Sequence, residues 1–439
     1  MSYKICIINP KTKGVIDLLE PLGLMSLATY LKQRGIQAKI IDEIAGQDVF
    51  KEIESFKPNL VGFTAVTCTY PRAVELMQKI KTLGYRTVVG GVHVCSFPEQ
   101  ALRDGFDMVV VGEGERMLFE IITKGHQRGV FRVSREMLLE ENEFPIVDRS
   151  LVDMNFYFDM AGKVTNVTNK RTAFIMTSRG CPFQCIFCNN IWQKLPMRFT
   201  PHEKIIEEID SLVHDYQVQH VGLGGNDFFL NKEKAHAFCK LMHKRGATVT
   251  WSTSARTDSL DEETISLAAC AGCTMIGFGF ESGSQRILDI LNKKLTVQTN
   301  FEIAKLCHKH NIEVAGLIMV GNPTETMDDI RLTWDFIKKV HVDTLRITVA
   351  TPLPGTTLWQ LCKERGYIPE NVDFSRFYVT RGFIQIPDTF SPKQAENIKK
   401  KLLLKAHLFN PKLRKKLIMR FCHDPFCLMK LVLKNIPRI

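Results

Sequence analysis

Three cysteines lie close together in the middle of the chain, with a spacing suited to metal chemistry. Cys181, Cys185 and Cys188 form a CxxxCxxC pattern within RGCPFQCIFC. A cube-shaped iron–sulfur cluster normally takes four thiolates, so a loop that supplies three leaves one iron open to an exogenous ligand. This spacing differs from the C-x₂-C pairs of zinc sites. We therefore predict a 4Fe–4S cluster, with three buried structural thiols as the alternative interpretation.

A repeating strand–helix pattern surrounds these cysteines. From Arg171 onward, six apolar strands, each followed by a helical stretch, read TAFIMTS, HVGLGG, TVTWSTS, TMIGFGF, EVAGLIMV and TLRITVA. Six such units with right-handed crossovers curl into a partial (β/α)6 barrel, which we assign to residues 171–366. Chemistry in such a barrel gathers at the carboxyl ends of its strands. The cysteines directly follow the first strand, so the motif and the architecture agree.

This part of the chain resembles the radical S-adenosylmethionine (SAM) superfamily. That family's signature is CxxxCxΦC, in which Φ is aromatic, and Phe187 fills that position. The resemblance implies that the open iron chelates SAM and that one electron cleaves its sulfonium to a 5′-deoxyadenosyl radical, which abstracts hydrogen. Asn226 stands where an acidic residue is usual, with Asp227 adjacent. The residues that the resemblance assigns to SAM are Phe187, Gly224, Gly225, Asn226, Arg256, Glu281, Ser282 and Gly321.

A second α/β pattern precedes the barrel. Five continuous, β-branched strands alternate with helical segments over residues 1–125, which predicts an N-terminal doubly wound, Rossmann-like parallel sheet. Its ligand should lie beyond the carboxyl ends of the strands. Residues 126–170 are polar and irregular, and we interpret them as a connector.

Four N-terminal segments read PLGLMSLATYL, FTAVTCTYPRAVEL, VVGGVHVCSFPEQAL and VVVGEGE. In these segments the sequence resembles the cobalamin-binding domain that often precedes a radical SAM barrel. Asp42 is followed by Glu43-Ile44-Ala45-Gly46, without a histidine to bind cobalt from below. The radical-enzyme branch commonly lacks that ligand, so the resemblance implies binding without it, and a fold that has lost its ligand is the alternative. For His93, a supporting or surface role is favoured over cobalt ligation. The residues assigned to cobalamin are Thr64, Gly90, Gly91, His93, Gly112 and Glu113.

The positive charge of the chain is concentrated at its C-terminal end. The net charge is +11, and residues 391–439 contain 13 Lys or Arg against 2 Asp or Glu. A nucleic-acid-binding protein of uniformly basic character would spread its positive charge along the chain, so nucleic acid is not expected as a partner. Residues 367–439 are predicted to be a basic helical tail with helix starts at Ser391-Pro392, Asn410-Pro411 and Asp424-Pro425. Its apolar face either rests on anionic lipid or caps the barrel.

The remaining features bound the cellular context. The first residues lack the layout of a signal peptide, and the thirteen cysteines are scattered, so reduced thiols and a cytoplasmic location are expected, with peripheral membrane attachment as a further hypothesis. Cys270 and Cys273 spell CxxC, but they span a helix end and a strand. We interpret them as packing thiols.

Together these patterns predict an enzyme that uses a 4Fe–4S cluster, SAM and cobalamin. Most relatives with this domain pair methylate an unactivated carbon, here of a small molecule for which a lipid-like or tetrapyrrole-like character is a hypothesis. Ring formation, a radical enzyme without cobalamin and a non-enzymatic cofactor carrier are the alternatives. An electron donor such as flavodoxin or ferredoxin is implied. No catalytic side chain beyond the cofactor ligands is identified.

Overall fold

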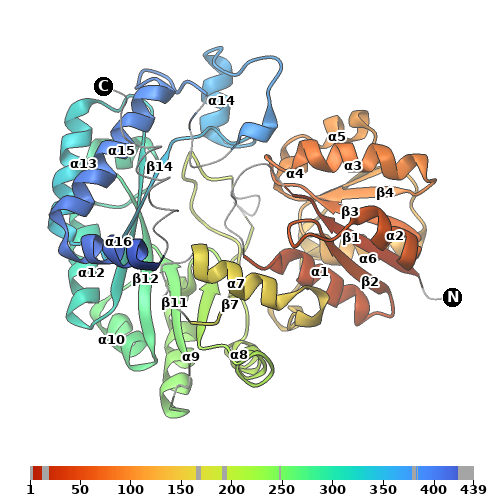
Figure 1. Ribbon diagram of the computed structural model, residues 1–439, viewed down its shortest axis with the longest axis horizontal. Coiled ribbons are helices and arrows are strands. Elements are labelled where there is room, and N and C mark those ends of the chain that lie inside the picture. Colours follow the sequence, from red (N-terminus) through yellow and green to blue (C-terminus); the bar gives the residue numbers. More distant parts are fainter. Residues whose placement is uncertain are drawn as a thin grey trace.

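The computed structural model describes residues 3–11, 19–164, 170–189, 195–246, 249–377, 382 and 384–423. Its frame is two six-stranded parallel sheets, set side by side (Figure 1). The first contains β1 (Lys4–Asn9), β2 (Gln37–Asp42), β3 (Leu60–Thr64), β4 (Thr87–Gly90), β5 (Met108–Val111) and β6 (Gly129–Arg132). The second contains β7 (Thr172–Met176), β10 (His220–Gly224), β11 (Thr250–Ala255), β12 (Cys273–Glu281), β13 (Glu313–Val320) and β14 (Thr344–Val349).

The first sheet has the order β2-β1-β3-β4-β5-β6 and is covered on both faces. Successive residues of β1 enter opposite cores: Ile5 and Ile7 pack on one side, Cys6 and Ile8 on the other. Such two-sided burial explains why its strands are continuously apolar. Helices α1 (Leu22–Lys32) and α6 (Gly114–Lys124) cover one face. The other carries α2 (Val49–Phe56), α3 (Tyr70–Thr82), α4 (Val92–Ser96) and α5 (Pro98–Asp104).

The prediction of a five-stranded sheet is wrong by one strand. β6 lies in the predicted connector and pairs in parallel with β5 from Met108↔Gly129 to Val111↔Arg132. It is an edge strand whose residues are only partly buried, so its sequence, GVFR, lacks a long apolar run. The connector also contains η1 (Arg135–Met137), η2 (Glu141–Glu143), η3 (Arg149–Leu151) and α7 (Met154–Val164).

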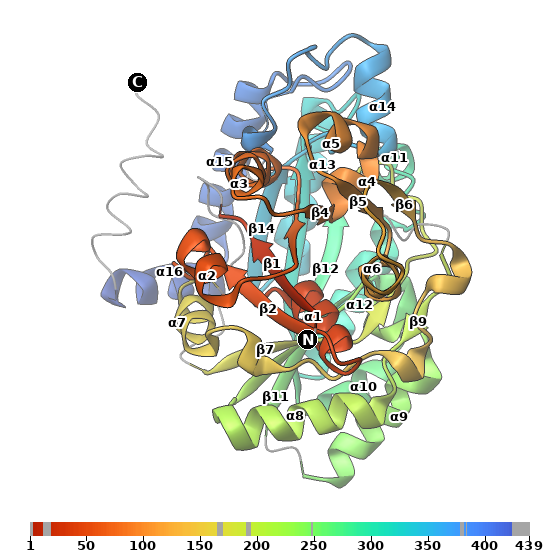
Figure 2. The same ribbon diagram turned by 90° about the vertical axis from the view of Figure 1, so that its right-hand side faces the viewer.

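The second sheet follows the chain order without a reversal, β14-β13-β12-β11-β10-β7, as expected for a partial barrel. In Figure 2 the N-terminal domain faces the viewer and the barrel lies behind it. All six predicted strands are present. Its helices are α8 (His202–Tyr216), α9 (Lys232–Lys244), α10 (Glu262–Cys270), α11 (Gln285–Ile290), α12 (Val297–Lys309), α13 (Met327–Val340) and α14 (Thr357–Glu364), with η4 (Phe228–Leu230), η5 (Thr257–Ser259) and η6 (Phe374–Arg376) between them. A short antiparallel ribbon, β8 (Ser178–Arg179) with β9 (Arg198–Phe199), brackets the cysteine segment.

Two helices of the basic tail begin where the sequence predicts. Ser391 caps α15 (Pro392–Phe409) in a capping box with Gln394, and α16 (Pro411–His423) starts after Asn410, whose side chain accepts from the N–H of Lys412 at 2.9 Å. The inner face of α15 packs on the barrel core through Ala395, Leu402 and Ala406. The tail therefore does cap the barrel. The third predicted helix start, at Asp424-Pro425, lies outside the described residues.

Candidate functional site

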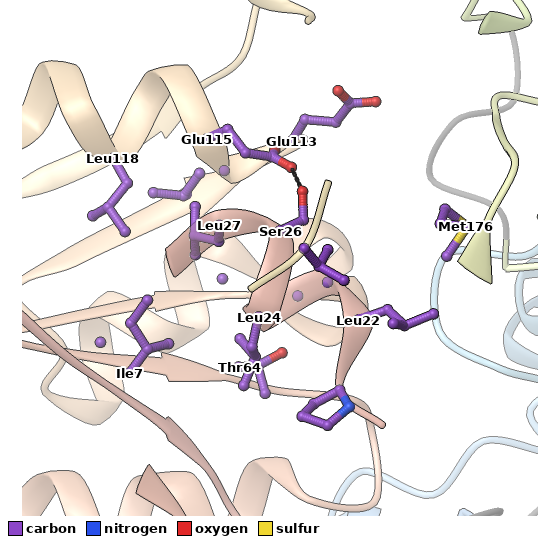
Figure 3. A pocket seen from close by; sticks show the side chains of 18 of the residues that line it. Ile7, Leu22, Leu24, Ser26, Leu27, Thr64, Glu113, Glu115, Leu118 and Met176 are labelled. Atoms are coloured by element: carbon purple, nitrogen blue, oxygen red, sulfur yellow. Dashed lines mark hydrogen bonds between the residues drawn. The ribbon is translucent and has the colours of Figure 1, made fainter. Parts of the chain in front are cut away.

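A pocket of about 450 Å³ opens at the carboxyl ends of β1, β3, β4 and β5 (Figure 3). This is where a doubly wound sheet binds its ligand, because the strand order reverses between β1 and β3. Five of the six residues predicted to bind cobalamin line it: Thr64, Gly90, Gly91, Gly112 and Glu113. The barrel contributes Met176, the last residue of β7, so the ends of the two sheets meet here.

The walls of this pocket are largely apolar and would accept a partly apolar ligand. Ile7, Val88 and Val110 reach it from the strands, and Leu24 and Leu118 reach it from α1 and α6. Its rim is bare backbone at Gly23 and Gly90: an added Cβ would meet no atom within 4 Å at Gly23, and only a carbonyl at 4.0 Å at Gly90. These positions leave room for a ligand to approach the main chain.

Gly91 has a different task. Its φ is +108°, and a Cβ there would lie 2.6 Å from the carbonyl oxygen of Ala65. Only glycine fits this close approach of β4 to the segment after β3. The turn then starts α4 and leads the chain away from the pocket.

The structure does not bring His93 to the pocket. Its side chain is fully buried in α4 and packs against Tyr70, Phe97 and Phe374, with ring centroids 4.1, 5.4 and 4.7 Å away. Burial lowers the pKa of His93 to about 4, and neither ring nitrogen has a hydrogen-bond partner among the described residues. Of the two roles that the sequence favours, the surface role is therefore wrong, because the ring is part of an aromatic core joining the two domains. The supporting role stays a prediction.

Polar groups occupy the position after β2 where a cobalt-binding histidine would stand. Asp42 accepts from the hydroxyl of Tyr157 and from the Asn9 amide at 3.1 Å. Glu43 is held by Arg72, whose Nε lies 3.1 Å from its Oε1. No histidine is among the described residues that line the pocket. The described part of the chain thus offers no imidazole there.

The three cysteines are half-buried beside the barrel mouth. The N–H of Ile186 donates to Leu291 at 3.1 Å, and the Asn292 amide donates to the carbonyl of Gln184 at 2.8 Å. Burial raises the pKa of Cys185, and the nearby cations Lys293 and Arg256 act in the opposite direction. Three thiols on one loop beside two cations fit an anionic iron–sulfur cluster.

No group of three or more His, Cys, Asp or Glu side chains within the described ranges is arranged to hold a single metal ion. The CxxC pair is split as predicted. Cys270 ends α10 and is exposed, whereas Cys273 opens β12 and is buried.

The glycine-rich end of β10 packs against the residue run that leads into the cysteines. Gly224 accepts from the N–H and the hydroxyl of Thr177, both at 2.7 Å. Gly225, at φ +139°, lies so close to Ser178 that a Cβ would be 3.0 Å from its nitrogen. The side-chain amide of Asn226 donates to the carbonyl of Gly180. These three predicted SAM residues therefore adjoin the base of the cysteine loop.

The structure explains why an acidic residue follows Asn226. Asp227 is 3% exposed and accepts from the N–H of Arg256 at 3.0 Å and from the hydroxyl of Ser259 at 3.2 Å. Burial raises the pKa of Asp227 to about 6 in spite of these bonds. Asp227 thus joins the ends of β10 and β11, and Asn226 is the side chain directed at the loop.

Arg256 and Glu281 also reach the cysteine loop. The guanidinium of Arg256 lies 3.6 Å from the ring centre of Phe183 and forms a two-point ion pair with Asp258 at 2.9 and 2.8 Å. Glu281 pairs with Lys293 at 3.0 Å, and Lys293 in turn lies 5.9 Å from the ring centre of Phe187.

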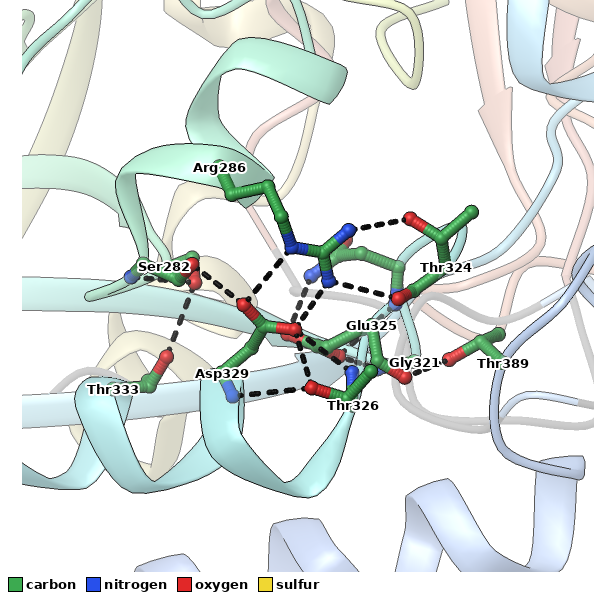
Figure 4. A network of polar contacts seen from close by, with 11 residues as sticks. Ser282, Arg286, Gly321, Thr324, Glu325, Thr326, Asp329, Thr333 and Thr389 are labelled. Atoms are coloured by element: carbon green, nitrogen blue, oxygen red, sulfur yellow. Dashed lines mark hydrogen bonds and ion pairs between the residues drawn. The ribbon is translucent and has the colours of Figure 1, made fainter.

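Ser282 and Gly321 take part in a different, buried network (Figure 4). Ser282 shares a hydrogen bond of 3.1 Å with Thr333 of α13. Gly321 donates to Glu325 at 2.6 Å, and burial raises the pKa of that carboxyl to about 7. The structure places these two predicted SAM residues in contacts that shape the turns after β12 and β13.

Sequence reasoning missed the arginines that line the interface. Arg179 and Arg198 flank the cysteine segment and bond to Glu113, which precedes α6. Arg149 similarly binds Glu208 and lies 3.7 Å from Glu20. The sequence shows these charges but gives no sign of their partners.

Comparison with known proteins agrees with both predicted modules. A family model described as the radical SAM superfamily matches residues 175–371, and one described as a B12 binding domain matches residues 16–122. An uncharacterized methyltransferase of Pyrococcus horikoshii is 31% identical over 388 residues, covering 81% of this chain and 82% of that protein. The anaerobic magnesium-protoporphyrin IX monomethyl ester cyclase of Rubrivivax gelatinosus is 28% identical over 421 residues, covering 84% and 75%.

Solved structures share the whole two-domain fold. The radical SAM methyltransferase TsrM from Kitasatospora setae, with tryptophan and a SAM analog bound, aligns with a TM-score of 0.69 at 18% identity, covering 84% of this chain and 77% of that one. The cobalamin-dependent radical enzyme OxsB, with aqua-cobalamin and SAM bound, gives 0.72 at 16% identity, covering 96% and 71%. With its three-cysteine barrel and its N-terminal B12-binding domain, the chain belongs to the cobalamin-dependent branch of the radical SAM superfamily.

Proposed function

We propose that this radical SAM enzyme is a cobalamin-dependent methyltransferase that acts on an unactivated carbon of a hydrophobic small molecule. The observation that carries the proposal is the shared wall between the two modules. Arg179, two residues before Cys181, lines the pocket of the N-terminal domain. A donor group held in that pocket and a reaction at the cysteine loop would therefore be neighbours.

The residues have distinct roles in this proposal. Cys181, Cys185 and Cys188 hold the cluster. The SAM site is formed by groups around their loop and by the residues that follow β12 and β13: Phe187, Gly224, Gly225, Asn226, Arg256, Glu281, Ser282 and Gly321. Thr64, Gly90, Gly91, Gly112 and Glu113 form the corrinoid site. When bound, the cluster supplies the electron that cleaves SAM, and methylcobalamin supplies the methyl group. The protein positions these groups and keeps water away from them.

The names of two relatives support a hydrophobic substrate. Besides the Rubrivivax gelatinosus cyclase, a bacteriochlorophyllide d C-8(2)-methyltransferase of Chlorobaculum tepidum is 25% identical over 331 residues. Both are named for tetrapyrroles. We propose a tetrapyrrole-like or lipid-like substrate for this chain on that ground.

Ring formation is the second candidate. The relative named a cyclase aligns with 84% of this chain, so its similarity extends through both modules. In that case cobalamin would serve a reaction other than methyl transfer.

An assay of SAM-derived products separates these functions. The protein would be reconstituted anaerobically with iron and sulfide, reduced with dithionite, and given SAM and a tetrapyrrole acceptor for several turnovers, with and without methylcobalamin. Methyl transfer predicts 5′-deoxyadenosine together with S-adenosylhomocysteine that appears only with the corrinoid. 5′-Deoxyadenosine without S-adenosylhomocysteine would favour ring formation. No change in the corrinoid absorption spectrum on mixing would contradict cobalamin dependence.

Two partners complete the proposal. Each reductive cleavage needs one electron, which we assign to a small donor such as flavodoxin or ferredoxin. The outer face of α15 supports contact with an anionic membrane: Leu404, Leu408 and Phe409 are 64, 58 and 69% exposed among lysines. No helix of the described chain is both long and apolar enough to cross a bilayer.

A further inference from the structure

The segment that carries the three cysteines starts and ends on one two-stranded ribbon. Arg179 of β8 faces Arg198 of β9 in antiparallel register, and the cysteines lie between these strands in sequence. Gly180, which follows β8, packs against the residues just before β9. A Cβ added at Gly180 would lie 2.6 Å from the carbonyl oxygen of Pro196. Contacts within the protein alone therefore hold the two ends of the cysteine segment together.

Both arginines of the ribbon point into the N-terminal domain. Arg198 forms a two-point ion pair with Glu113, with one contact at 3.1 Å, and donates to the carbonyl of Leu139 at 2.7 Å. Arg179 reaches the same Glu113 at 3.3 Å and also Glu115 at 2.8 Å. We call Glu113, Glu115, Arg179 and Arg198 the clamp.

The clamp is buried and internally balanced. Its four side chains are between 3 and 12% exposed, with two positive and two negative charges. Burial alone would raise the pKa of Glu115, but Arg179 and a 2.8 Å bond from Ser26 outweigh it and lower that pKa. Charge-assisted bonds in such a setting are strong and geometrically specific. The ribbon therefore has one preferred position on the N-terminal domain.

The same groups form part of the ligand pocket. Glu113, Glu115, Arg179 and Ser26 all line it, as Figure 3 shows for Ser26 and the two carboxylates. A molecule in the pocket would thus touch the side chains that hold the base of the cysteine segment.

We propose that the clamp positions the cysteine loop from the N-terminal domain and transmits occupancy of the pocket to that loop. The second half rests on the proposed function, because it takes the occupant to be a corrinoid. Arg179, Arg198, Glu113 and Glu115 are positioning residues in this scheme, acting on the metal-binding loop through the β8–β9 ribbon.

Cysteine labelling tests the positioning role without any activity measurement. The full-length protein would be stripped of iron and treated with iodoacetamide, and the labelling rate of each cysteine followed by mass spectrometry. The double variant Arg179→Gln/Glu115→Gln removes both charges together, so no buried ion is left unpaired. We expect labelling of Cys181, Cys185 and Cys188 to rise about tenfold or more relative to the exposed Cys270, a factor that corresponds to about 1.4 kcal/mol.

Arg116→Gln is the matched control. Arg116 lies on the same helix as Glu115 but pairs with Glu143 of the connector. It should leave all labelling rates unchanged. Arg179→Lys keeps the charge with fewer donors and should give an intermediate rate, and it serves if the double variant does not fold. Unchanged loop labelling in folded Arg179 variants would overturn the positioning role.

Adding hydroxocobalamin tests the transmission. In the wild type it should slow labelling of the three loop cysteines. The double variant lacks two groups that line the pocket, so it would be titrated with the corrinoid until the absorbance change is complete, and at that saturation labelling should no longer be slowed. Binding without any effect on wild-type labelling would overturn the coupling. Absence of binding to the wild type would refute the corrinoid function and the coupling, while the positioning role would still be decided by the first experiment.

Discussion

At the scale of single residues, the cysteine motif makes the sharpest prediction. Replacing Cys181, Cys185 and Cys188 with alanine should abolish the reconstituted cluster's visible absorbance and its EPR signal, because each supplies one of three thiolates. Cys270→Ala is the control, since Cys270 is also accessible but stands apart at the end of α10. Equal iron and sulfide content in the two variants would contradict the assignment of the motif.

His93 gives a prediction about acid stability. Its folded pKa of about 4 lies below the ordinary 6.5, so below pH 6.5 the unfolded chain binds a proton that the folded chain does not. Stability from this group is therefore present above pH 6.5 and is lost as the pH falls toward 4, by at most about 3 kcal/mol. His93→Phe should keep the aromatic packing and remove this loss.

Urea unfolding at pH 7 and pH 4.5 would measure that effect as the difference between wild type and variant. His214→Gln is the control, because the His214 side chain is 89% exposed. If His93→Phe shows the same loss between the two pH values as the wild type, the buried neutral imidazole is not responsible.

Some residue roles could be predicted from the sequence and others could not. The cysteine spacing is local, so the motif and the aromatic Phe187 are visible in a few residues. The contacts of Arg256 with Asp227 and with Phe183 join residues far apart along the chain, so they depend on which strand ends meet. The bonds of Ser282 to Thr333 and of Gly321 to Glu325 likewise depend on how the turns after β12 and β13 pack.

At the scale of elements, neighbouring glycines at the end of β4 should behave differently. Gly90→Val adds a side chain at the pocket rim, where little is in contact, so it should weaken corrinoid binding by about 1–3 kcal/mol with little change in melting temperature. Gly91→Ala puts a Cβ against Ala65 at a positive φ, so it should cost more than about 1 kcal/mol of stability.

Absorbance titration with hydroxocobalamin and thermal melts, both on the two variants, check this pair of expectations. If Gly90→Val binds the corrinoid as tightly as the wild type, the ligand does not approach the backbone at β4. A Gly91→Ala protein with an unchanged melting temperature would mean that the turn relaxes at no cost.

Elements with a strong apolar period were predictable, whereas edge elements were not. Every strand predicted from an apolar run is present in the structure. Strands buried on both faces are continuously apolar, and such runs are visible in the sequence. β6 and α7 belong to the segment interpreted as irregular. β6 is partly exposed at a sheet edge, and α7 docks through Tyr157 onto Asp42, a contact between distant parts of the sequence.

At the scale of the whole molecule, charge organises the join between the domains. Besides the clamp, Arg149 donates to the carbonyl of Phe174 and binds Glu208 of the barrel, and it lies beside Glu20 of the N-terminal domain. Burial raises the pKa of Glu20 and of Glu208, although Arg149 acts against it in both. Composition alone gives equal numbers of opposite charges before residue 391, but not their pairing across an interface.

The exposed face of α15 is the subject of the last prediction. α15 turns Ala395, Leu402 and Ala406 inward, which leaves Leu404 and Leu408 outward beside Lys400, Lys401 and Lys405. None of these three lysines pairs with an acidic side chain within the described part of the chain. Each lysine near an anionic membrane contributes about 1 kcal/mol, so Lys400→Gln/Lys401→Gln/Lys405→Gln should weaken binding to phosphatidylglycerol vesicles by about two orders of magnitude.

The control variant removes the same total charge elsewhere. Lys32, Lys79 and Lys124 have side chains 42, 58 and 61% exposed, and they lie on α1, α3 and α6 of the N-terminal domain, whereas α15 packs on the barrel. Their replacement by glutamine should leave vesicle sedimentation near the wild-type level, because attraction that is local to one surface is screened within about a Debye length. Equal losses in the two triple variants would mean that net charge alone is sensed. No sedimentation of the wild type would mean that α15 serves only to cap the barrel.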